Sequence, residues 1–127
     1  MPRILIVDDE SGIRSLLSSV FGLAGYEVRT AAAACEAMEL CAAEIFDVLL
    51  SDVHMPGTNG HELVGWVARR YPEIRCALMS SFNPMACEDC PVQSSCPFLE
   101  KPFHPLDAVL MVEHLLRESP ANGRCAH

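Results

Sequence analysis

The sequence is poor in positive charge and in long apolar runs. Nine lysine and arginine residues stand against seventeen aspartate and glutamate residues, a formal net charge of −8 at pH 7. This acidic surplus opposes contact with phosphate backbones and anionic lipids, so we expect no nucleic-acid partner and no membrane partner. The apolar run Ala108–Val112, among the longest, has five residues, whereas a membrane span needs about 18 or more.

Cysteine is too scarce for a small secreted domain held by disulfides. The chain has seven cysteines among 127 residues, below the share of about 8–10% that is typical of such scaffolds. The odd count and the lack of a secretory hydrophobic segment favour a reducing compartment, so we expect a cytoplasmic protein. The length and an apolar share of 50% predict one folded domain at residues 1–119, followed by a polar tail at residues 120–127.

Short apolar runs alternate with helical patterns along the chain. Strands are predicted at residues 4–7, 26–30, 48–50, 74–79 and 98–99. Helices are predicted around the apolar positions of residues 13–20, 34–45, 63–67 and 106–116, the first with Glu10 in its first turn. Three prolines between residues 84 and 97 predict a short or distorted further helix. The alternation predicts a doubly wound α/β domain with a parallel sheet of five strands.

Polar side chains follow most of the predicted strands at the point where each ends. Asp8 and Asp9 follow the first strand, Asp52 the third, Ser80 the fourth, and Lys101, the only lysine in the chain, the fifth. Ligands of a doubly wound sheet bind at the carboxyl ends of its strands. We therefore expect three aspartates, one hydroxyl and one lysine to converge at this edge.

Three neighbouring carboxylates repel one another and remain ionised only beside a counter-charge. Mg²⁺ can provide this charge, because it prefers oxygen ligands and uses one or two carboxylates together with a phosphoryl oxygen. Lys101 would add a point charge for the same phosphoryl group. An aspartate in this setting can attack phosphorus and form an acyl phosphate, and Asp52, on the central strand, is the candidate nucleophile.

Several segments, in this order and at these separations, carry a resemblance to a known family. They are residues 4–10 (ILIVDDE), residues 48–57 (VLLSDVHMPG), Gly60, Ser80 and residues 98–103 (FLEKPF). Over residues 2–118 the chain resembles the receiver domain of two-component response regulators. The resemblance implies a flavodoxin-like sheet with strand order 2-1-3-4-5.

The resemblance also implies roles at the acidic edge of the sheet. Asp52 would be the phosphoacceptor. Mg²⁺ would be bound by Asp9, Asp52 and the backbone carbonyl of His54, with Asp8 acting through water. Ser80 would hydrogen-bond the phosphoryl group.

Lys101 would pair with the phosphoryl group, and Phe98 would be an aromatic switch that moves inward when the group is bound. We therefore expect a single-domain response regulator. It would accept a phosphoryl group from a sensor histidine kinase or phosphotransfer protein and signal to a downstream protein by contact. Its own catalysis would be limited to self-phosphorylation and self-dephosphorylation.

A cysteine cluster, formed by Cys87, Cys90 and Cys96, departs from the receiver pattern. Three thiols at this spacing are compatible with a Zn²⁺ or iron–sulfur site, although such sites usually have four protein ligands. A reversible disulfide between Cys87 and Cys90 is a second hypothesis, and free thiols in an irregular loop are a third. The alternative function is thus a degenerate receiver that responds to metal or redox state.

Overall fold

The computed structural model describes residues 2–55, 57–80, 98–101 and 103–117, which form nine helices and strands. In chain order these are β1 (Arg3–Val7), α1 (Ser11–Leu23), β2 (Glu27–Ala31), α2 (Ala34–Ala43), β3 (Val48–Asp52), α3 (Gly60–Arg70), β4 (Arg75–Ser80), β5 (Phe98–Glu100) and α4 (Pro105–Arg117). The further helix predicted between β4 and β5, and the cysteine cluster, lie outside the described residues.

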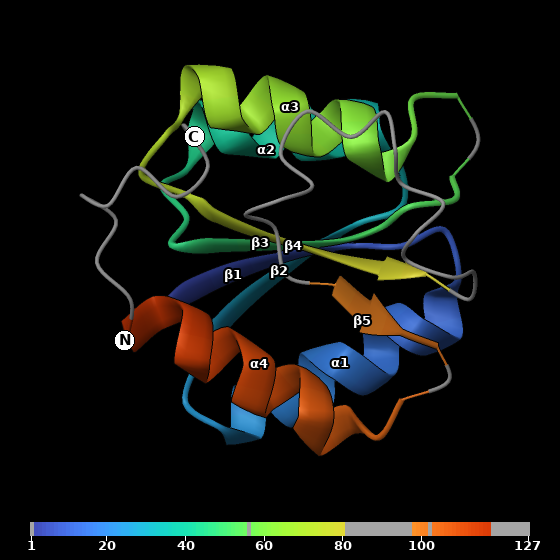
Figure 1. Cartoon of the computed structure of the whole chain (residues 1–127), viewed down its shortest axis with the longest axis vertical. Coiled ribbons are helices and arrows are strands. Elements are labelled where there is room, and N and C mark those ends of the chain that lie inside the picture. The colour runs from blue at the N-terminus through green and yellow to red at the C-terminus, as the bar shows by residue number, and fades with distance from the viewer. Residues whose placement is uncertain (1, 56, 81–97, 102, 118–127) are drawn as a thin grey trace.

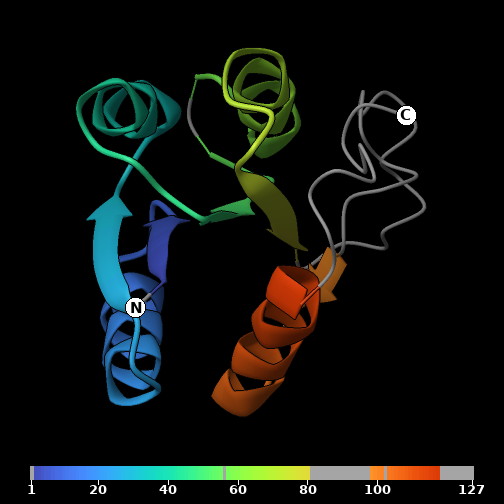
Figure 2. The same ribbon diagram turned by 90° about the vertical axis from the view of Figure 1, so that its left-hand side faces the viewer.

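The five strands form one parallel sheet in the order β2-β1-β3-β4-β5. This confirms the predicted doubly wound fold and its strand order 2-1-3-4-5. Helices α2 and α3 cover one face of the sheet, and α1 and α4 cover the other (Figure 1). The same two helical layers are separate in the view turned by 90° (Figure 2). Among the described helices, none is long and apolar enough to cross a membrane.

Alternate residues of the central strands pack into two separate cores. In β1, Ile4 and Ile6 pack with residues of α1 and α4, whereas Leu5 and Val7 pack with residues of α2 and α3. Since successive side chains of a strand point to opposite faces, a strand covered on both sides must be apolar throughout. The apolar run at residues 4–7 therefore follows directly from the layered fold.

Helix faces differ in detail from the sequence prediction. Ile45, predicted on the apolar stripe of the second helix, lies beyond the end of α2 and is 77% exposed. Leu16, Leu106 and Leu110 are exposed as well. Glu10 is the N-cap residue of α1 and does not lie in its first turn. Helical spacing identifies an amphipathic helix, but it does not show how wide a stripe the neighbouring elements cover.

Candidate functional site

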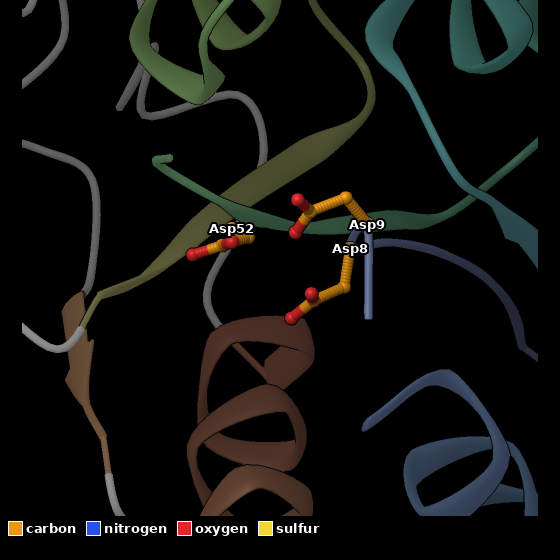
Figure 3. Close-up of side chains that lie close together, drawn as sticks. All are labelled: Asp8, Asp9 and Asp52. Atoms are coloured by element: carbon orange, nitrogen blue, oxygen red, sulfur yellow. The ribbon is translucent and has the colours of Figure 1, made fainter. Parts of the chain in front are cut away.

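Three carboxylates converge at the carboxyl ends of β1 and β3, as the sequence predicts. One carboxylate oxygen from each of Asp8, Asp9 and Asp52 lies within 4.8 Å of the others (Figure 3). Asp52 is the last residue of β3, and Asp8 directly follows β1. The backbone N–H of Asp8 donates to the carbonyl of Ala31 at 3.1 Å, which holds this position beside β2. We call these three aspartates the acidic cluster.

The members of the acidic cluster differ in exposure. Asp52 lies two and four residues after Leu50 and Val48 in β3, so its side chain points to the same face of the sheet as theirs. The side chains of Val48 and Leu50 pack with α1 and α4 on that face. Asp8 is fully buried and Asp52 is 5% exposed, whereas Asp9 is exposed. The cluster thus joins two buried carboxylates to one that reaches solvent.

Lys101, which directly follows the edge strand β5, joins the acidic cluster. Its Nζ lies 2.9 Å from Asp8 Oδ2, 3.5 Å from Asp52 Oδ1 and 3.7 Å from Glu10 Oε1. The backbone N–H of Lys101 donates to the carbonyl of Ser80 at 2.7 Å, so the residue is held where β4 and β5 end. The convergence predicted for this lysine is observed.

Burial and charge act in opposite directions on the two central groups. Burial raises the pKa of Asp52, the carboxylate of Asp8 raises it further, and Lys101 and the backbone N–H of His54 lower it in part. Burial lowers the pKa of Lys101, but Asp8, Asp52 and Glu10 together outweigh burial and raise that pKa above its usual value. The lysine is therefore held as a cation, whereas the charge on Asp52 is only partly compensated.

The backbone around the acidic cluster is held by contacts that the sequence did not reveal. The guanidinium of Arg14 donates from Nη1 to the carbonyl of Asp8 at 2.6 Å, and the backbone N–H of Glu10 donates to Asp8 Oδ1 at 2.9 Å. Gly60, the first residue of α3, lies so close to β3 that a Cβ there would be 2.3 Å from the carbonyl oxygen of Asp52. Of these three residues, Glu10 and Gly60 belong to segments that resemble the receiver motif, whereas Arg14 had no sequence signal.

The structure gives the positions of the other predicted site residues, and their roles stay predictions. Ser80 is buried as the last residue of β4, and Phe98 is the first residue of β5. The backbone N–H of His54 hydrogen-bonds the carboxylate of Asp52, while its carbonyl as a metal ligand stays a prediction. The predicted cysteine site at Cys87, Cys90 and Cys96 falls outside the described residues.

The donor set of the site fits Mg²⁺. All of the converging side-chain donors are carboxylate oxygens, the ligands that a hard divalent cation prefers. Lys101 contacts the carboxylates of Asp8, Asp52 and Glu10, and Asp9 brings a fourth carboxylate to the same site. A divalent cation would offset two of the three negative charges that remain when all four carboxylates are ionised.

Comparisons with known proteins give one family. A family model for the response regulator receiver domain matches residues 4–113. Response regulator protein FleR of Pseudomonas aeruginosa is 31% identical over 122 residues, which cover 94% of this chain and 26% of FleR. Response regulator receiver protein CpdR of Brucella abortus is 31% identical over 117 residues, which cover 91% of this chain and 98% of CpdR. The chain thus spans about a quarter of FleR and nearly all of CpdR.

A solved structure agrees with these relatives. The response regulator protein TrrA of Thermotoga maritima, in complex with Mg²⁺–BeF, superposes with a TM-score of 0.82 at 28% identity, covering 91% of this chain and 99% of that one. The fold, the acidic cluster and the family match agree with the resemblance seen in the sequence. The chain belongs to the family of response regulator receiver domains of two-component systems.

Proposed function

We propose that Asp52 of this receiver domain accepts a phosphoryl group from a sensor histidine kinase or phosphotransfer protein. The observation that carries the proposal is the position of Asp52, 3.5 Å from Lys101 and within 4.8 Å of Asp8 and Asp9. A carboxylate oxygen of Asp52 attacks phosphorus, the bond from phosphorus to the donor atom breaks, and the donor leaves with that electron pair. The product is an acyl phosphate on Asp52.

The surrounding residues then position and neutralise the transferred group. Lys101 is held as a cation beside Asp52 and pairs with the phosphoryl oxygens, while Ser80, at the end of β4, hydrogen-bonds them. Asp9, Asp52 and the His54 carbonyl would hold Mg²⁺, which when bound supplies positive charge to the phosphoryl oxygens. Asp8 fits a role through water, because its two oxygens already accept hydrogen bonds from Glu10 and Lys101.

We also propose that the phosphorylated state is passed on to a downstream protein by direct contact. CpdR, which the match covers to 98%, is itself named a response regulator receiver protein. Phe98 keeps its proposed role as the switch that transmits the phosphorylated state, and a cytoplasmic location follows from the partners proposed. Family membership favours this function over a metal- or redox-responsive module.

Incubation of the purified chain with acetyl phosphate and Mg²⁺ tests the proposal. Intact mass should show the gain of one phosphoryl group, and Asp52→Asn should abolish the gain because an amide is a poor nucleophile. If the phosphorylated form is too short-lived for mass analysis, consumption of acetyl phosphate in the same samples reports the transfer instead. Asp107→Asn, an exposed residue on α4, is the matched control. A gain that persists in Asp52→Asn would contradict the proposal.

A further inference from the structure

Arg14 joins α1 to the segment that presents the first two aspartates. It is the fourth residue of α1 and is partly buried. Its Nη1 donates to the carbonyl oxygen of Asp8 at 2.6 Å, a short contact from a charged donor. A charge-assisted hydrogen bond of this kind is stronger than a bond between neutral groups, so it constrains the carbonyl that it meets.

The constrained carbonyl belongs to the peptide unit between Asp8 and Asp9. Because the peptide unit is planar, fixing its oxygen also fixes the amide of Asp9 and restricts where the Asp9 side chain can point. Asp9 is exposed, so core packing does not set the direction of its carboxylate. The hydrogen bonds from the Asp8 N–H to Ala31 and from the Glu10 N–H to Asp8 hold the peptide units directly before and after the one between Asp8 and Asp9. Arg14 provides the third restraint.

We propose that Arg14 is a positioning residue for the divalent cation site of the acidic cluster. By holding the Asp8 carbonyl, it keeps the Asp9 carboxylate within reach of Asp52, at the separation observed. Figure 3 shows Asp8 and Asp9 leaving the end of β1 in different directions, which is the divergence that a fixed peptide unit between them maintains. The inference rests on the proposed function, since both use the same cation site.

The charge of Arg14 and its hydrogen bond to the Asp8 carbonyl predict opposite changes in Mg²⁺ affinity when Arg14 is replaced. A guanidinium beside the acidic cluster repels a divalent cation, so electrostatics alone would make Mg²⁺ binding tighter when Arg14 is removed. Positioning predicts weaker binding, because the flexible Asp9 carboxylate must then be ordered when the cation binds. The sign of the change in Mg²⁺ affinity separates the two roles.

Titration of the full chain with MgCl₂ at constant ionic strength, followed by calorimetry, is the direct test. Arg14→Met keeps the apolar stem and removes all donors, and it should weaken Mg²⁺ binding about tenfold, as loss of an outer-shell partner usually does. Arg14→Lys keeps the charge but replaces the planar donor group, so its affinity should fall between those of Arg14→Met and the unsubstituted chain. With acetyl phosphate, the Mg²⁺ concentration for half-maximal phosphorylation should rise, while the rate at saturating Mg²⁺ changes little.

Two variants serve as matched controls. Ser15→Ala alters the next residue of α1, which lines the same surface groove of about 320 Å³ as Arg14, and Arg69→Met removes an exposed positive charge on α3. Neither should weaken Mg²⁺ binding. Equal or tighter binding by a folded Arg14→Met protein would overturn the inference.

The remaining outcomes are also decisive. If Arg14→Met does not fold, Arg14→Lys decides, because the inference requires weaker binding at an unchanged melting temperature, and an unchanged or higher affinity overturns it. If the unsubstituted chain neither binds Mg²⁺ nor accepts a phosphoryl group, the proposed function fails first and this inference fails with it. If the unsubstituted chain does both and Arg14→Met binds Mg²⁺ normally, only the role of Arg14 fails.

Discussion

At Asp52, burial and the carboxylate of Asp8 oppose the ionised form, and Lys101 offsets them only in part. The pKa of Asp52 in the folded chain therefore lies above the value near 3.8 expected for the unfolded chain. At pH values below the unfolded-state pKa, the protonated carboxyl of Asp52 contributes its full stabilisation of the fold. This stabilisation is lost as the pH rises through the folded-state pKa. At neutral pH the ionised carboxylate of Asp52 therefore lowers the stability of the fold, and this carboxylate is the proposed nucleophile.

Asp52→Asn should accordingly stabilise the chain at neutral pH when Mg²⁺ is absent. The variant removes a buried charge while Asp8 and Glu10 still pair with Lys101. We expect the free energy of unfolding at pH 7 to rise, because the raised pKa of the Asp52 carboxyl means that its ionised form opposes folding. Urea unfolding from pH 3 to pH 8 measures it, and the difference from the unsubstituted chain should shrink towards the acidic end.

The control for this substitution is Asp107→Asn, which removes an exposed carboxylate from α4 and should leave stability almost unchanged or slightly lower. A lower stability of Asp52→Asn at neutral pH would mean that Lys101 compensates the charge of Asp52 fully, contrary to the direction of its pKa shift.

Among the described elements, α3 begins in close contact with the backbone of β3 beside the site. Its first residue, Gly60, donates its backbone N–H to the carbonyl of Val53 at 2.9 Å. A Cβ at Gly60 would lie 2.3 Å from the carbonyl oxygen of Asp52 and 2.8 Å from the Cα of Val53, and both are backbone atoms. A capping box between Asn59 and Glu62 fixes the start of the same helix. The helix therefore has little freedom to move away from β3.

Gly60→Ala should destabilise the fold, although alanine is usually favoured over glycine in a helix. We expect a loss of about 1–3 kcal/mol, the usual cost of overpacking, because the backbone of Asp52 and Val53 must shift. Gly22→Ala on α1 is the matched control, since nothing lies within 4 Å of a Cβ there, and it should raise stability by about 0.5–1 kcal/mol. Urea unfolding compares the two variants. Equal effects would show that Gly60 is not constrained by β3.

The elements also show what the sequence could and could not reveal. Strand alternation and the order of Asp8, Asp52 and Lys101 predicted the sheet and the acidic cluster, because strand ends meet at one edge whatever the details of packing. The exposure of Leu106 and Ile45 was not predictable, since the width of a buried stripe depends on neighbouring elements. The contact from Arg14 to the Asp8 carbonyl was missed because, unlike a capping box, a hydrogen bond from an arginine to a carbonyl six residues earlier has no sequence pattern.

At the scale of the whole molecule, segments almost a hundred residues apart form the site. Residues 8 and 101 are joined by an ion pair of 2.9 Å across a parallel sheet whose strand order places β1, β3 and β4 together at its centre. The chain as a whole carries a net charge of −8, so any cation stabilises it to some degree through screening. A specific cation site must therefore be separated from general screening.

Mg²⁺ should raise the melting temperature of the unsubstituted chain more than NaCl of the same ionic strength does. At a Mg²⁺ concentration of 100 times the dissociation constant, binding to the folded state alone adds about 2.7 kcal/mol. Asp9→Asn and Glu39→Gln each remove one exposed negative charge, on the acidic cluster and on α2 respectively, so screening changes equally in both. Asp9→Asn should lose most of the Mg²⁺-specific increase, whereas Glu39→Gln should keep it. An equal loss in the two variants would show that Mg²⁺ acts on the total charge of the chain and not at the acidic cluster.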